Sequence, residues 1–358
     1  MYKSLTSLLV VGILLSSCSK EKIPPPSSNP NNETETGWLV PLDQLLISLL
    51  PQDRIQSIDT PHFETLDNDN IENNETVYVY RWENTIKVYS QRILWGHEIV
   101  NDQIGNHHFA ITYCPITGSA VAWNREINGE VTEFGVSGHL YNENLIPYDR
   151  NSSSYWSQML LQSIKGDHGG DELESNMLLS TTGATVKKAF PNALVLVDTT
   201  GHICNDSICI NPNHNYDTGN PDNHNKDIAT SDYFGIINVG VVNGGNGALL
   251  FKYDNFSDSI DVYNTYFRNS KVIIAGSKSL EFIIAFKDDT GNPNIQFYPV
   301  QEALPVIMKD NNGNRYDLTG LVISGPSAGN RLPSPKAYSA HGFAWESFFG
   351  GNTIMFEE

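Results

Sequence analysis

The chain repeats itself, and this internal similarity limits its fold more than any other feature of the sequence. Residues 97–134 align with residues 260–297 at a shift of 163 positions, so that Val121-Ala122-Trp123 meets Ile284-Ala285-Phe286. Further matches continue in order at shifts of 161 and 159 positions, as two small loop deletions would produce. Self-similarity of this kind is typical of repeated structural units. We therefore expect two related halves, residues 78–200 and 233–358.

Each half is predicted to contain antiparallel strands followed by one short helix. Alternating or apolar runs at 109–113 and 119–127 predict strands, and Asn128-Gly129 predicts a tight hairpin turn. Residues 182–192 and 341–351 predict the helix of each half, ended by proline in the first and by glycine in the second. The predicted fold class is α+β and β-rich, with several antiparallel strands and a short helix in each half.

The N-terminus has the features of a bacterial lipoprotein signal. An apolar run at residues 8–15 is too short to span a bilayer, which needs about 20 residues. Leu15-Ser16-Ser17-Cys18 matches a lipobox, so we expect a signal peptide at residues 1–17 and a lipidated Cys18. An ordinary cleaved signal with an incidental cysteine is the alternative. The interpretation predicts a lipid-anchored protein of the bacterial cell envelope, and Ser19 favours the outer membrane.

Polar segments separate these parts of the chain. Residues 18–37 are predicted to be the lipidated N-terminus and its tether, and residues 38–77 lead into the first half. Residues 201–232 lack apolar periodicity, which predicts an exposed loop insertion between the halves. Cys204 and Cys209 lie in this loop, and a local disulfide is their simplest interpretation in an oxidising compartment. A metal site with neighbouring histidines is the alternative.

The charge of the chain limits its partners. Asp and Glu number 41 against 22 Lys and Arg, which gives a formal net charge of −19. Such a chain lacks the basic surface that binds phosphate backbones, so we expect no nucleic-acid partner. The sequence predicts one partner, the membrane, which the lipid anchor would bind. The sequence does not identify a ligand or a protein partner.

Several motifs of the first half, in their order and spacing, resemble a bacterial family. They are His97-Glu98-Ile99-Val100-Asn101-Asp102, Thr112-Tyr113-Cys114-Pro115, Phe134-Gly135-Val136-Ser137-Gly138 and Tyr148-Asp149-Arg150. The family is known as a domain of unknown function (DUF3179), and the similarity covers roughly residues 40–358 apart from the loop. It implies a fold but no established activity. The second cysteine that many relatives have is Thr117 here, which argues against a two-thiolate site.

The repeat also distinguishes two candidate functional residues from their counterparts. Cys114 aligns with Ser277 and His97 aligns with Ile260, so this thiol and this imidazole occur only in the first half. A residue needed only to fold the repeated unit should often recur in both halves. The asymmetry therefore indicates a function near residues 90–160. Cys114 has three interpretations: a buried structural residue, a metal ligand or a reactive thiol.

Metal binding is the first functional interpretation of this region. Thiolate and imidazole ligands suit a copper or zinc ion. Cys114, His97 and His139 form the candidate metal set, and Met159 is a further candidate ligand for Cu(I). For each lone histidine, a hydrogen-bonded place in the core or at the surface is the alternative.

Nucleophilic catalysis is the second functional interpretation. Cys114 would need a neighbouring base to form a thiolate at neutral pH, and His97 is the candidate base. Glu98, Asp102 or Asp149 would orient this imidazole. No complete catalytic set is visible, so we expect a non-enzymatic protein that binds a metal or small ligand in its first half. The alternative is an envelope enzyme that uses Cys114 as nucleophile or metal ligand and His97 as base.

Overall fold

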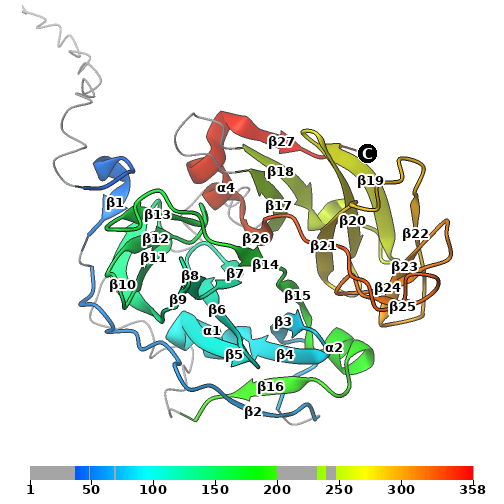
Figure 1. The fold of residues 1–358 in the computed structure, drawn as a ribbon, viewed down its shortest axis with the longest axis horizontal. Coiled ribbons are helices and arrows are strands. Elements are labelled where there is room, and N and C mark those ends of the chain that lie inside the picture. The colour runs from blue at the N-terminus through cyan, green and yellow to red at the C-terminus, as the bar shows by residue number, and fades with distance from the viewer. Residues whose placement is uncertain (1–36, 48, 68–69, 200–231, 239–246, 358) are drawn as a thin grey trace, which may run out of the picture.

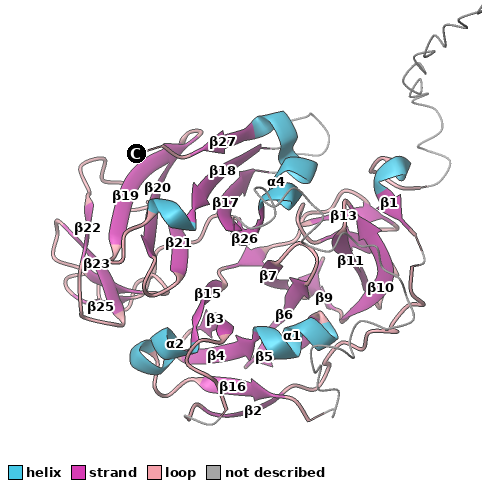
Figure 2. Ribbon diagram, turned by 180° about the vertical axis from the view of Figure 1, so that it is seen from behind, coloured by secondary structure: helices cyan, strands magenta, loops and turns pink. Residues whose placement is uncertain are grey.

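Two β-rich halves lie side by side in the structure (Figure 1). The computed structural model describes residues 37–47, 49–67, 70–199, 232–238 and 247–357. Strands and short helices connected by turns and loops make up both halves (Figure 2). Within these residues, no helix has both the length and the apolar character needed to cross a bilayer. The prediction of a β-rich fold with few short helices is confirmed.

The first half forms three sheets, with strand orders β1-β10-β11-β12-β13, β14-β7-β6-β5 and β15-β3-β4-β16-β2, and a hairpin of β8 and β9. Its strands are β1 Leu45–Leu46, β2 His62–Thr65, β3 Thr76–Trp82, β4 Thr85–Ser90, β5 Ile99–Ile104, β6 His107–Cys114, β7 Ser119–Asn124, β8 Glu126–Ile127, β9 Glu130–Val131, β10 Phe134–Tyr141, β11 Asn144–Asp149, β12 Tyr155–Ser157, β13 Gln162–Lys165, β14 Ser175–Asn176, β15 Leu179–Thr182 and β16 Leu194–Val197. Its helices are η1 Leu42–Gln44, α1 Gln91–His97 and α2 Gly183–Ala189.

The second half forms sheets with strand orders β26-β17-β18-β27, β19-β20-β21 and β22-β23-β24-β25. Its strands are β17 Asp232–Asn238, β18 Gly247–Lys252, β19 Asp261–Phe267, β20 Ser270–Ser277, β21 Phe282–Lys287, β22 Phe297–Pro299, β23 Val306–Asp310, β24 Arg315–Asp317, β25 Val322–Ser324, β26 Ala337–His341 and β27 Thr353–Met355. Its helices are η2 Tyr253–Asn255, α4 Gly342–Phe349 and η3 Gly350–Asn352.

The two halves have corresponding strand orders. The order β15-β3-β4-β16 matches β26-β17-β18-β27, and in both sheets the last strand pairs in parallel with its neighbour. The meander β5-β6-β7 matches β19-β20-β21, and the row β10 to β13 matches β22 to β25. The predicted helices are also found at corresponding places, because α2 follows β15 directly and α4 follows β26 directly.

One pair of hydrogen bonds recurs in both halves. The side chain of Asn101 donates to the carbonyl of Phe134 and accepts from its N–H, at 2.8 and 2.9 Å. Asn264 makes the same two bonds with Phe297, at 2.9 and 3.0 Å. In each half, the asparagine side chain therefore holds the first residue of a strand, β10 or β22, against a strand of another sheet, β5 or β19.

The main hydrophobic cores are shared between the halves. One core joins β10 to β13 of the first half with β17, β18, β26 and α4 of the second. Another joins β3, β4, β15, β16 and α2 of the first half with β20 to β25 of the second. The partly buried Arg81 of β3 also pairs with the buried Asp317 of β24, with 2.7 Å between nitrogen and oxygen. Two smaller cores lie within single halves, but neither half encloses all of its buried apolar surface alone.

The structure adds one helix that the sequence did not predict. Helix α1 begins after Ser90, whose hydroxyl accepts from the N–H of Arg92, and it buries Ile93 and Leu94. The second half has only the short helix η2 at the corresponding place. The prediction of a single helix per half was therefore wrong for the first half. With seven residues, including a glycine, α1 has too little periodicity for a pattern to reveal it.

Candidate functional site

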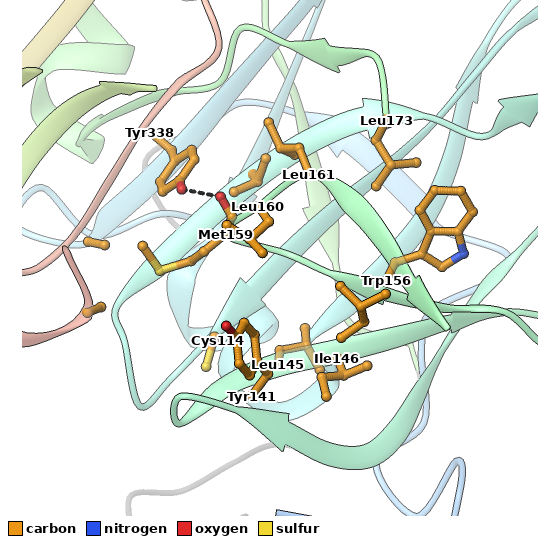
Figure 3. Close-up of a cluster of buried hydrophobic side chains, with 14 of the residues drawn as sticks. Cys114, Tyr141, Leu145, Ile146, Trp156, Met159, Leu160, Leu161, Leu173 and Tyr338 are labelled. Carbon is orange, nitrogen blue, oxygen red and sulfur yellow. Dashed lines mark hydrogen bonds between the residues drawn. The ribbon is translucent and has the colours of Figure 1, made fainter. Parts of the chain in front are cut away.

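Cys114 ends strand β6 and lies in the core that joins β10–β13 to α4. Its side chain is buried, and Figure 3 shows it beside Tyr141 and Leu145. The sulfur is 3.7 Å from the carbonyl oxygen of Glu143. Burial raises the pKa of the Cys114 thiol, and the negative charge of Glu98 raises it further. The sulfur is therefore held as a neutral thiol, which is a poor nucleophile.

Glu98 is the ionisable group whose charge acts on this thiol. It follows α1 with a φ of 58°, a conformation that costs energy for a residue with a side chain. The residue as a whole is half-buried, and the loss of water around its carboxyl raises the pKa of that carboxyl from 4.5 to about 8. The carboxyl forms no hydrogen bond or ion pair within the part of the chain that the structure describes. An acid with these properties is a candidate for function.

A tight turn lies against Cys114. Asn142 and Glu143 connect β10 and β11 with φ values of 48° and 63°, the geometry of a two-residue hairpin turn. The carbonyl of Glu143 is the one that faces the thiol. The hairpin therefore sets the position of this carbonyl.

A buried polar network supports the turn after Cys114. The Asn144 amide donates to the hydroxyls of Thr117 and Ser119, at 2.9 and 3.1 Å, and to the Gln158 carbonyl at 2.7 Å. The Gln158 amide in turn donates to Thr112 at 3.0 Å. All these side chains are buried. The network therefore fixes Thr117 and gives the turn a defined shape, and the sequence analysis did not identify it.

The described contacts of His97 lead away from Cys114. Its Nδ1 donates to the carbonyl oxygen of Gln56 at 2.7 Å. Its Nε2 lies 3.9 Å from the carboxylate of Asp198. These contacts hold the imidazole within the fold, and the predicted use of His97 as a base for Cys114 receives no support from them.

The two aspartates expected to orient His97 have other partners. Asp102 accepts from Lys87 at 2.7 and 2.8 Å and from the Tyr89 hydroxyl at 2.6 Å. Asp149 accepts from the Ser152 hydroxyl and the Trp156 indole N–H, at 2.6 and 3.0 Å. Both carboxylates therefore hold neighbouring side chains of the fold together.

The other predicted metal ligands lie in different surroundings. His139 stacks on Tyr155, with 5.2 Å between ring centroids, and burial lowers its pKa. Met159 shares the core of Cys114 (Figure 3). Among the described residues, no group of three or more His, Cys, Asp or Glu side chains is arranged to hold a metal ion. Cys18, Cys204 and Cys209 lie outside the described residues.

A second surface of the first half forms an acidic groove of about 330 Å³. Its lining residues are Asn124, Glu126, Ile127, Asn128, Asp171, Glu172, Leu173 and Glu174. Glu172 pairs with Lys336 at 2.6 Å, and Glu174 accepts from Asn124 at 2.7 Å. Because Glu172 and Glu174 already have protein partners, the Glu98 carboxyl is the better candidate for binding a ligand.

The motif residues used for the sequence comparison meet in space. Asp59 accepts from Asn101 and from Arg150, both at 2.7 Å, and Arg150 also pairs with Glu133 at 2.6 Å. A family model described as a protein of unknown function (DUF3179) matches residues 52–352. The chain belongs to this family. Comparisons with curated proteins and with solved structures give no match.

Within the DUF3179 motifs, the structure separates structural from candidate functional residues. Asn101, Asp102, Asp149 and Arg150 tie sheets and segments together. Glu98 and Cys114, in contrast, are an ionisable carboxyl and a thiol whose pKa values are both raised. The sequence analysis considered Glu98 only as a residue that orients His97. Its backbone conformation and its burial could not be read from the motif.

Proposed function

We propose that this chain is a lipid-anchored protein of the bacterial cell envelope that binds a metal ion or small ligand at Glu98 and Cys114. The lipobox that ends at Cys18 supports the anchor, and the apolar run before it supports export. Lipidation of Cys18 would leave residues 19–36 between the anchor and the first described residue. The ligand-binding region is the first half.

The observation that carries this proposal is the carboxyl of Glu98. A carboxyl with a pKa of about 8 and no protein partner is held neutral at physiological pH. It can donate a hydrogen bond to a ligand, or lose its proton to a bound cation. The neighbouring Cys114 supplies a soft sulfur donor, which suits copper or zinc more than hard cations.

An internal duplication is part of the proposal and distinguishes Cys114 from the corresponding residue of the second half. The corresponding strand orders and the shared Asn–Phe hydrogen bonds support common descent of the halves. Ser277 takes the place of Cys114 and donates to the carbonyl of Asp258 at 3.0 Å. Helix α1, which positions Glu98, has no counterpart of its length. Asp261 takes the place of Glu98 and accepts from the N–H of Ser257 at 2.7 Å, so the second half keeps an acid but lacks the thiol and a helix of this length.

Binding agrees better with the thiol than nucleophilic catalysis does. A nucleophilic cysteine needs a lowered pKa, whereas burial and the charge of Glu98 raise that of Cys114. A cation that binds both groups would displace their protons, so its affinity should increase with pH.

Elemental analysis and native mass spectrometry of protein purified from its own envelope test the proposal. We expect copper, zinc or a small molecule in the wild type, lost in Glu98→Gln and in Cys114→Ser. Ser277→Ala is the matched control, because it changes the corresponding position of the other half. A wild type that carries neither a metal nor a ligand and gains no thermal stability from added Cu(I) or Zn²⁺ would contradict binding at this site.

A second candidate function rests on the same carboxyl. An acid with a pKa near 8 is protonated at neutral pH and can act as a general acid in an envelope enzyme. A pH–rate profile with a limb near 8 that Glu98→Gln removes would favour this enzyme over the binding protein.

A further inference from the structure

Four large aliphatic side chains are exposed close to the start of the described chain. Leu39, Leu42, Leu46 and Ile47 are 49%, 39%, 45% and 50% exposed. We call these four residues the apolar ridge. The other seven exposed large hydrophobic residues in the described parts are spread between residues 95 and 355. A local concentration of exposed apolar surface usually marks an interaction site.

The ridge is held firmly to the first half. The N–H of Leu39 donates to the carbonyl of Ile164 at 2.8 Å. Strand β1, which contains Leu46, pairs with β10 in the register Leu46 to Leu140. Alternate side chains of the segment, Trp38 and Leu45, are buried in the core. The exposure of the ridge therefore belongs to an ordered edge of the fold.

We infer that the apolar ridge lies against the lipid bilayer and orients the molecule on the membrane. This inference rests on the proposed anchor at Cys18. Residues 19–36 connect Cys18 to the first described residue, and 18 extended residues span at most about 60 Å. The ridge begins two residues after Gly37, so it is the described surface nearest in sequence to the anchor, at one corner of the molecule (Figure 1).

The contact is apolar in character. Asp43 lies between the ridge residues. Asp167 is exposed three residues after Ile164, whose carbonyl bonds to Leu39, and Lys165 lies over the Trp38 ring at 4.6 Å. With a net charge of −19, the whole chain is not attracted to anionic lipid. Burial of the aliphatic side chains must therefore supply the attraction, and binding to zwitterionic lipid should change little with salt.

Flotation with zwitterionic phosphatidylcholine vesicles tests the inference on the unlipidated Cys18→Ser chain. We expect weak binding that Leu42→Gln/Leu46→Gln/Ile47→Gln reduces by about tenfold or more, since three exposed aliphatic groups are replaced. Tyr266→Gln/Tyr298→Gln/Ile323→Gln replaces equally exposed residues of the second half and should leave the binding unchanged. Equal binding by both triple variants, or no binding by the parent chain at any lipid concentration, would overturn the inference.

Two further measurements separate this inference from the proposed anchor and from self-association. Metabolic labelling with a fatty-acid analogue tests Cys18 in the native chain, so vesicle binding without labelling would contradict the anchor alone. Sedimentation of the Cys18→Ser chain tests the other use of an apolar surface. A dimer that the ridge variant separates into monomers would assign the ridge to a contact between copies and overturn the membrane inference.

Discussion

Glu98 should make the stability of the protein depend on pH. The folded state holds its proton up to about pH 8, whereas the unfolded chain loses it near 4.5. Between these values only the unfolded state ionises, so the free energy of unfolding falls as the pH rises. Below pH 4.5 this effect is absent, and above pH 8 the loss is complete.

Glu98→Gln removes this dependence. We expect the melting temperature of the variant minus that of the wild type to be larger at pH 8 than at pH 5. Thermal unfolding followed by circular dichroism at both values measures this, with the exposed Glu346→Gln as control. An identical difference at the two pH values would show that the Glu98 carboxyl is not held neutral.

Cys114 should react slowly with alkylating reagents in the folded protein. Its sulfur is buried, and its thiol pKa is raised by burial and by Glu98. Labelling with iodoacetamide at pH 9, followed by peptide mass spectrometry, should be much slower in the native state than in urea. Glu98→Gln should accelerate the native reaction, because it removes the carboxylate that opposes the thiolate. Labelling of the native thiol as fast as in urea would contradict the buried position.

At the scale of single residues, the sequence could identify the place of the site but not its chemistry. The comparison of Cys114 with Ser277 pointed to the first half. The raised pKa of Glu98 depends on a left-handed backbone and on packing, and neither leaves a pattern in the sequence. The contacts of His97 with Gln56 and of Asp102 with Lys87 join separate segments of the chain, and no local pattern in the sequence predicts them.

At the scale of elements, the two asparagines that join sheets should contribute to stability in the order of their burial. Asn101 is buried and also donates to Asp59, whereas Asn264 is only partly buried. Asn101→Ala leaves the N–H and carbonyl of Phe134 without partners, which costs about 2 kcal/mol or more. Urea denaturation should show this loss, with a smaller one for Asn264→Ala. A larger loss for Asn264→Ala would contradict the order expected from burial.

Elements with strong local signals were the ones the sequence could predict. The Asn128-Gly129 turn lies between β8 and β9 with positive φ at both residues, and α2 and α4 lie within their predicted ranges. Helix α1 escaped prediction because a helix of only seven residues is stabilised mainly by packing of Ile93 and Leu94. The lead-in at 38–77 proved to contain strands, since β1 and β2 pair with distant β10 and β16.

At the scale of the whole molecule, the shared cores predict that the halves fold together. Each of the two cores contains buried residues from both halves, and Arg81 pairs with Asp317 across them. We expect one calorimetric transition for the full chain. Fragments 37–199 and 232–357, expressed alone, should lack a cooperative transition because each exposes apolar surface that the other half covers. Two separate transitions, or a fragment that melts cooperatively by itself, would contradict this prediction.

The crossing of the cores also has a consequence for how a ligand could enter. Many two-lobed receptors capture their ligand by swinging the lobes apart on a hinge and closing again. Here such a swing would open both shared cores to water at once. A ligand of the proposed site at Glu98 and Cys114 should therefore bind while the two halves stay closed. Association should follow a single exponential whose rate is proportional to ligand concentration, without the plateau that a slow closure imposes.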